Sequence, residues 1–142
     1  MKTVFKQSRL AVAIATMIVG MYAGAAHAAD VKVGLTGGHE VPPVTTSAKG
    51  SGTITINQDM TVSGSVTTSG VTGTMAHIHE AASGKNGPVI VPLEKKGDNQ
   101  WVVPVGAKLS EAQYKAFQKG DLYVNVHSAA HPNGEIRAQL TP

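Results

Sequence analysis

The chain has 142 residues, 42% of them hydrophobic and 4% aromatic, and it contains no cysteine. Without cysteine there can be no disulfide, thiolate metal site, catalytic thiol or iron–sulfur ligation, so any metal must be held by histidine, methionine or carboxylate side chains. The formal net charge of +3 includes no run of basic residues, and a nucleic-acid partner is therefore not expected.

Residues 1–28 have the pattern of a secretory signal peptide. Lys2, Lys6 and Arg9 precede an apolar stretch, and small residues follow it where a signal peptidase reads the chain. The alternative is an uncleaved membrane anchor, but the apolar stretch is shorter than the ~20 residues that a span needs. Without the leader, nine basic residues balance nine acidic ones. We therefore expect a periplasmic or secreted protein with no membrane span after signal cleavage.

The first elements predicted after the leader are strands. Residues 31–37 alternate apolar and polar side chains and predict a strand, whereas Pro42–Pro43 make the next segment an edge or a loop. Residues 52–70 predict a hairpin that turns at 57–59, because isoleucine and valine alternate with threonine and serine on both sides.

Three further short strands are predicted in the middle of the chain, at 71–80, 89–93 and 100–105. The polar stretch 94–99 between the last two predicts a turn, because its lysines, glycine and aspartate carry no apolar alternation. The strands at 89–93 and 100–105 are apolar, which is typical of strands that contribute to a core.

One helix is predicted, over about 110–119. Ser110 suits its N-cap, and Gln113 completes a capping box. The chain then returns to strand over 121–127 and 135–140. About eight short strands and one short helix predict an all-β fold, a Greek-key or immunoglobulin-like β-sandwich. We expect a single domain over 30–142.

Three histidines are candidates for a metal site. His77 and His79 stand one residue apart in a predicted strand, so both side chains point to the same face. In the strand at 121–127 the apolar residues occupy the alternate positions, which leaves His127 on the non-core face. If the two strands lie in one sheet, the three rings can converge at its outer surface with a spacing that suits one ion.

Other residues are candidates for completing this site. His131 follows in a loop and His39 precedes the Pro42–Pro43 segment, so either could be a fourth ligand. Glu80 and Glu135 are candidate acceptors for the ring N–H groups. Imidazole ligands suit copper or zinc, and a thioether, such as that of Met75 in the same strand, would favour Cu(I).

The same residues also have plainer interpretations. Histidine on the solvent face of a sheet requires no metal, and a His-x-His pair alone is a weak motif. Arg137 alternates with Glu135 on one strand, which favours a structural ion pair over catalysis. No Gly-x-Ser-x-Gly nucleophile motif and no phosphate-binding glycine loop is present in the sequence.

Long stretches of the sequence closely resemble one family, the CHRD domain, which is named after chordin. The stretches are LTGGHEVPPVTTSAKGSGTITI, HIHEAASGKNGPVIVPL and GDLYVNVHSAAHPNGEIRAQL, and the resemblance as a whole extends over essentially all of 30–142. The resemblance implies an immunoglobulin-like or superoxide-dismutase-like β-sandwich. It carries over His77, His79 and His127 together with the loop residue His131, whereas His39 stands at a position where we expect variation.

A fainter similarity is to copper–zinc superoxide dismutase, which also has a His-x-His on a strand of a Greek-key fold. Here no disulfide can form, and no histidine-rich zinc loop follows His79. A likeness of fold does not carry an activity with it.

Three functions follow from these patterns. The first is an exported protein that binds a transition metal, copper in preference to zinc, for metal handling or stress protection rather than turnover. The second is a non-catalytic module that binds a protein partner and whose histidines are incidental. The third is a redox enzyme like superoxide dismutase, which needs an open coordination position on the metal.

Overall fold

The computed structural model describes residues 27–142, so the predicted signal peptide, apart from its last two residues, lies outside the described residues. Nine strands and one α-helix are present in this part of the chain, which confirms the all-β fold class. In chain order the elements are β1 (Ala29–Thr36), the 3-10 turn η1 (Gly37–His39), β2 (Lys49–Ile56), β3 (Val62–Ser69), β4 (Gly73–Glu80), β5 (Val89–Pro92), β6 (Glu94–Lys96), β7 (Gln100–Val102), α1 (Glu111–Gln118), β8 (Leu122–Ser128) and β9 (Ile136–Leu140).

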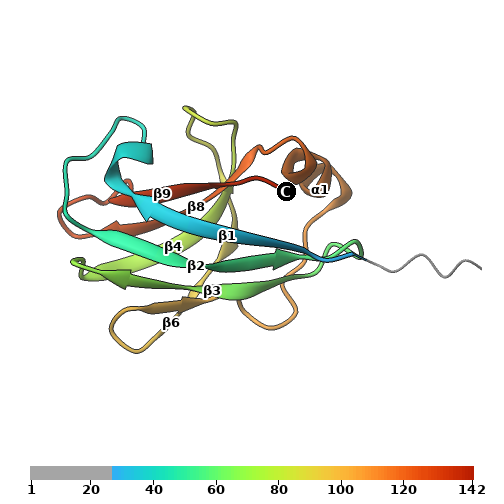
Figure 1. Ribbon diagram of the computed structural model, residues 1–142, viewed down its shortest axis with the longest axis horizontal. Helices are drawn as coiled ribbons and strands as arrows, with labels where there is room; N and C mark the ends of the chain where they lie inside the picture. Colours follow the sequence, from blue (N-terminus) through green and yellow to red (C-terminus); the bar gives the residue numbers. More distant parts are fainter. Residues whose placement is uncertain (1–26) are drawn as a thin grey trace, which may run out of the picture.

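All pairings between strands are antiparallel, and the strands follow the order β5-β4-β8-β9-β1-β2-β3-β7-β6. The sheet curls until its two ends approach one another. The backbone N–H of Leu93, between β5 and β6, donates to the carbonyl of Ala76 in β4 at 2.9 Å. The result is a nearly closed sandwich, with α1 at the end where the C-terminus lies (Figure 1).

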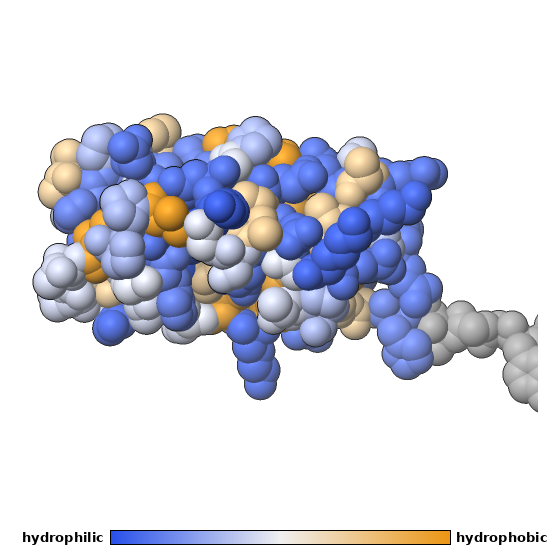
Figure 2. Space-filling model, turned by 90° about the horizontal axis from the view of Figure 1, so that it is seen from above, coloured by the Kyte–Doolittle hydropathy of each residue, from blue (hydrophilic) through white to orange (hydrophobic). Residues whose placement is uncertain are grey.

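The core fills the inside of this sandwich with the alternating apolar residues of the strands. Val31, Val33 and Leu35 of β1 are buried, and so are the apolar residues of β8, as their alternation predicts. Trp101 of β7 is also buried in this core. The outer surface seen in Figure 2 is mostly hydrophilic, with small, separate apolar areas.

The predicted helix and hairpin are confirmed. The Ser110 hydroxyl accepts from the backbone N–H of Gln113, whose side chain accepts from the backbone N–H of Ser110 in return. The β2–β3 hairpin turns at Asn57–Met60, and Met60 has a positive φ of 70°. No helix in the described part of the chain is long and apolar enough to cross a membrane.

One predicted turn is wrong. The stretch 94–99 was expected to be a turn throughout, but its first three residues form β6, which pairs with β7 in a hairpin. Gly97 makes the tight turn with a φ of 73°. Glu94, Lys95 and Lys96 are all exposed, so this strand lacks the apolar alternation that predicts strands from sequence. Backbone pairing to β7 places it in the sheet, and Lys95 adds a hydrogen bond from its Nζ to the Gly73 carbonyl at 2.9 Å.

Candidate functional site

The candidate site lies on two neighbouring strands, β4 and β8, which pair with Met75 opposite His127 and with His77 opposite Asn125. This confirms that the histidine-bearing strands lie in one sheet. An irregularity between Gly73 and Met75 shifts the register. Gly73 faces the core, where an added Cβ would lie 2.8 Å from the Trp101 ring. The bulge therefore shifts the alternation of side chains by one residue. As a result, the side chains of Met75, His77 and His79 in β4 point to the same face of the sheet as His127.

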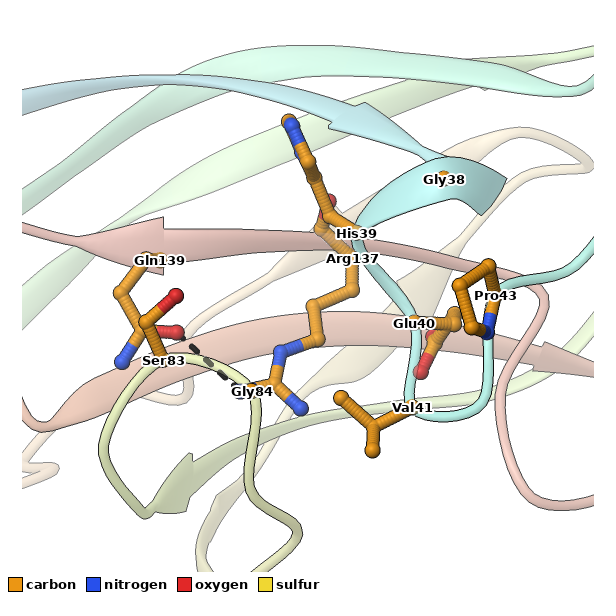
Figure 3. Close-up of a pocket in the computed structure, with 9 residues that line it drawn as sticks. All are labelled: Gly38, His39, Glu40, Val41, Pro43, Ser83, Gly84, Arg137 and Gln139. Atoms are coloured by element: carbon orange, nitrogen blue, oxygen red, sulfur yellow. Dashed lines mark hydrogen bonds between the residues drawn. The ribbon is translucent and has the colours of Figure 1, made fainter.

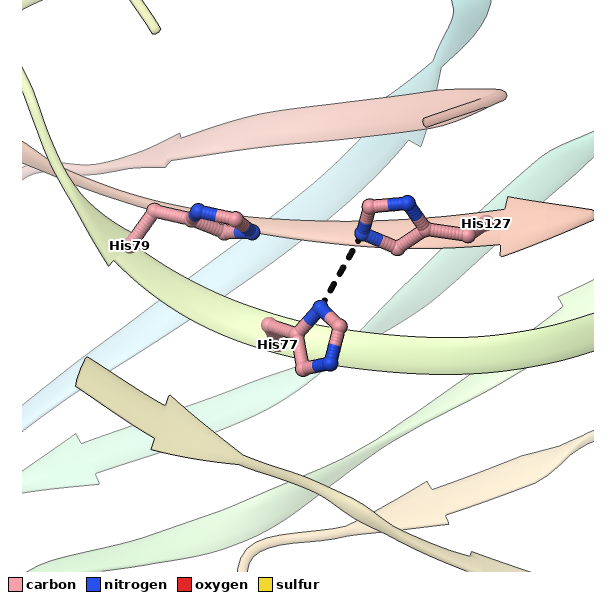
Figure 4. Close-up of side chains that lie close together, drawn as sticks. All are labelled: His77, His79 and His127. Carbon is pink, nitrogen blue, oxygen red and sulfur yellow. Dashed lines mark hydrogen bonds between the residues drawn. The ribbon is translucent and has the colours of Figure 1, made fainter. Parts of the chain in front are cut away.

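The three imidazole rings converge on this face (Figure 4). His77 Nδ1 lies 3.1 Å from His127 Nε2. Each of His77, His79 and His127 offers one nitrogen, and these nitrogens all lie within 4.8 Å of one another. Ligand nitrogens around one tetrahedral ion, with bonds of ~2.0–2.1 Å, are about 3.3 Å apart. Small side-chain movements would therefore bring all three nitrogens to one ion.

Backbone carbonyls fix two of the rings. His79 Nδ1 lies 2.9 Å from the carbonyl of Gly87, and His127 Nδ1 lies 2.8 Å from the carbonyl of Pro132. A carbonyl only accepts, so both Nδ1 atoms carry the proton and donate it. When the ring is neutral, Nε2 then presents its lone pair, and this is how ligand histidines are usually oriented. The predicted acceptors Glu80 and Glu135 do not take this role.

The expectation that the histidines lie on the outer surface is wrong for two of them. His79 is only 7% exposed and His127 only 6%, whereas His77 is half-buried. The segments that contain Gly87 and Pro132 cover the face through the carbonyl contacts described above. The pKa of His77 is lowered to about 4. Burial is the main cause, and electrostatic repulsion from the other two rings lowers the pKa further. Burial also lowers the pKa of His79. His77 and His79 therefore favour the neutral form, which is the form that binds metals.

A buried polar pair continues from His79. His79 Nε2 lies 3.0 Å from Oδ1 of Asn125, and Nδ2 of Asn125 donates to Glu40 at 3.4 Å. Both Asn125 and Glu40 are almost completely buried. Both ring nitrogens of His79 thus face oxygen acceptors, and a neutral ring donates from only one of them; a metal bound at Nε2 would take the place of the Asn125 contact. Asn125 was not predicted from the sequence, although its position on the non-core face, two residues before His127, is a usable signal.

The other two candidate ligands lie apart from the three-histidine cluster. His39, in η1, has its Nδ1 3.2 Å from the backbone carbonyl of Arg137. His131 is in the loop between β8 and β9, where its backbone N–H donates to the Ser128 hydroxyl. Among the described residues, neither belongs to the group whose nitrogens lie within 4.8 Å of one another.

A second feature of the same face is a buried arginine beside a pocket of about 470 Å³ (Figure 3). The Arg137 guanidinium lies 3.4 Å from the centre of the Tyr123 ring and donates to the Lys85 carbonyl and to the side chains of Asn86 and Gln139. The predicted ion pair with Glu135 is not formed: in the described residues the one ion pair joins Lys96 and Glu94. Arg137 therefore fastens the 81–88 loop over the face of the sheet.

Glu40 gives the protein a predicted pH dependence. Burial raises the pKa of this carboxyl from 4.5 to about 7, although Asn125 and Arg137 act in the opposite direction. Since the folded state holds the proton of Glu40 more tightly than the unfolded state does, the contribution of Glu40 to stability is greatest at low pH and falls as the pH rises from about 4.5 through 7. Pockets on either side of Glu40 admit water, which moderates the effect.

Replacing Glu40 with glutamine is expected to remove this pH dependence. The variant should match the wild type at pH 4.5 and exceed its free energy of unfolding by about 2 kcal/mol at pH 8. Urea unfolding at the two pH values measures the difference. The exposed Glu94→Gln change serves as the control and should leave stability within about 0.5 kcal/mol at both pH values. An unchanged pH profile in the Glu40 variant would contradict the prediction.

The fold and the site together define a small antiparallel β-sandwich protein with three histidines gathered between two neighbouring strands. Residues 31–140 match the CHRD domain family, and the chain belongs to that family. Comparison with curated proteins and with solved structures gives no match.

Proposed function

We propose that this CHRD-domain protein is exported and binds one transition-metal ion, copper in preference to zinc, through His77, His79 and His127. Its role would be metal handling or stress protection. One observation carries the proposal: backbone carbonyls hold the Nδ1–H groups of His79 and His127, Nε2 of His127 lies 3.1 Å from Nδ1 of His77, and the three rings offer nitrogens within 4.8 Å of one another. The proposal of export depends on the signal-peptide pattern of residues 1–28.

Two further observations support a metal at this place. The three rings are held close together, although this arrangement disfavours their protonated forms. His79 and His127 are buried, and a positive charge on one ring would repel a positive charge on the next. No carboxylate joins the cluster among the described residues, so the available ligands are imidazoles, which suit copper and zinc. Copper is favoured because it stands above zinc in the order of affinities for nitrogen ligands.

Calorimetric titration of residues 29–142, which contain every described strand, with Cu(II), Cu(I) and Zn(II) tests the proposal. We expect binding of one ion per chain with a submicromolar Kd. His77→Ala and His127→Ala should each weaken the binding by about 100-fold or more, because each removes one ligand, and the loss of a group that only orients a ligand already costs ~10–100-fold.

The chain supplies its own matched controls in His39→Ala and His131→Ala. Each of these changes removes one imidazole from outside the cluster, and neither should alter the affinity more than about twofold if the three-histidine cluster is sufficient. Binding that ignores His77→Ala and His127→Ala would refute the metal site. In that case a non-catalytic module for a protein partner would be the better account of the domain.

A further inference from the structure

Met75 lies beside the histidine cluster and is open to solvent. Its side chain is 48% exposed, one of three large apolar side chains of the described residues that are exposed. The other two, Val89 and Val105, lie on strand β5 and in a loop. Single exposed apolar residues are common and require no explanation by themselves. The position of Met75 relative to the three imidazoles is what distinguishes it.

The strand register places Met75 within reach of the cluster. It lies directly opposite His127 and two residues before His77 on the same face. Directly opposite residues in an antiparallel pair have Cβ atoms ~4.5–5.5 Å apart, and same-face neighbours along a strand are about 6.6 Å apart. Methionine is unbranched and has three rotatable side-chain bonds. Its sulfur can therefore swing over the neighbouring rings without movement of the backbone.

The bulge at the start of β4 is responsible for this placement. Gly73 pairs with Ser128, so a regular ladder would place Thr74 opposite His127. The extra residue instead places Met75 there, while the Thr74 hydroxyl donates to the His127 carbonyl at 3.3 Å. Bulges commonly re-aim side chains beside functional sites. Here the bulge replaces a hydroxyl with a thioether next to the cluster.

The cluster is least covered at His77, the nearer to Met75 of the two histidines on β4. Loops cover His79 and His127, whereas His77 is only half-buried and Met75 is exposed. His39 and His131 do not join the cluster, and no carboxylate among the described residues does so either. Three imidazoles leave one position of a tetrahedral ion unfilled, and the exposed sulfur of Met75 is the side chain placed to take it.

The charge of the site favours the lower oxidation state of copper. Three neutral imidazoles and one neutral thioether supply no negative charge, so the full charge of the ion has to be accommodated in a partly buried site. A singly charged ion costs less to bury than a doubly charged one. A thioether is also a soft ligand that selects Cu(I), whereas zinc sites use nitrogen, thiolate or carboxylate ligands.

We propose that Met75 Sδ is the fourth ligand of the His77–His79–His127 centre and makes that centre selective for Cu(I) over Zn(II). This inference rests on the metal-binding function proposed above. It adds a fourth ligand, a four-coordinate geometry and a preference for Cu(I) to that function. An experiment can refute these three additions without refuting metal binding by the histidines.

The test compares Met75→Leu with the wild type. Cu(I) affinity is measured by competition with the chromophoric chelator bicinchoninate, and Zn(II) affinity by calorimetry. We expect Met75→Leu to weaken Cu(I) binding by about tenfold or more and to change Zn(II) binding by less than about twofold. The copper X-ray absorption spectrum of the Cu(I) form should lose its copper–sulfur scattering in Met75→Leu and retain it in the wild type.

Met60→Leu is the matched control, because Met60 is the other methionine of the described residues and lies in the β2–β3 turn. It should leave the Cu(I) affinity and the copper–sulfur signal unchanged. If His77→Ala abolishes copper binding but Met75→Leu changes neither readout, the Met75 ligand is refuted and the histidine centre stands. If His77→Ala also leaves copper binding unchanged, both proposals fail together.

Discussion

Replacing Arg137 with methionine is expected to lower the free energy of unfolding by about 3 kcal/mol, although methionine retains much of the buried volume. The guanidinium donates to three acceptors, on Lys85, Asn86 and Gln139, and its carbon lies 3.4 Å from the centre of the Tyr123 ring. Hydrogen bonds from a charged donor stabilise the folded state by ~1.5–3 kcal/mol each. The loss is smaller than their total, because methionine also avoids the desolvation cost of burying a charge.

Chemical denaturation of the wild type and Arg137→Met at pH 7 measures this effect. Arg137→Lys should not restore stability, because an ammonium group cannot reproduce the planar fork or the stacking on Tyr123. Lys32→Met, on the exposed face of β1, is the control and should stay within about 0.5 kcal/mol of the wild type. A loss below about 1 kcal/mol in Arg137→Met would show that the loop is held by other contacts.

Replacing Gly64 with alanine is expected to cost about 4 kcal/mol or more, because two penalties coincide in the middle of β3. Its φ of 123° is unfavourable for any residue with a side chain. In addition, a Cβ at this position would lie 2.1 Å from the Thr53 carbonyl oxygen on the paired strand β2. Backbone atoms in a sheet cannot yield without breaking the ladder, so the strands would have to separate locally.

Gly97→Ala separates the two penalties. Gly97 also has a positive φ, of 73°, but an added Cβ would meet nothing within 4 Å. That change should therefore cost only about 1 kcal/mol, the backbone penalty alone. Thermal unfolding of both variants gives the comparison. Equal losses in Gly64→Ala and Gly97→Ala would contradict the steric argument.

The period-two alternation explains why so much of the fold and cluster was predictable. It placed Val31, Val33 and Leu35 in the core and placed His77, His79 and His127 on one face, and each of these placements is confirmed. The helix was predictable for a local reason, because its capping box lies within four residues of chain.

The surroundings of the histidines were not predictable in the same way. The carbonyls of Gly87 and Pro132 lie in loops that follow His79 and His127 by only eight and five residues, but no periodic pattern in those loops shows that they fold back over the rings. The same holds for Arg137, whose partners on the 81–88 loop are about 50 residues away in sequence. Sequence patterns therefore predicted which residues share a face, but not which residues cover it.

The two end strands of the sheet have a consequence for how copies of the protein behave at high concentration. The ends are β5 and β6, strands of four and three residues that follow one another in the chain (Figure 1). Pro88 precedes the first, Pro92 is its last residue, and the second consists of a glutamate and two lysines. Short edges that carry proline and charge offer a poor template for a strand from another molecule. The two strands between which the sandwich closes thereby also resist edge-to-edge aggregation.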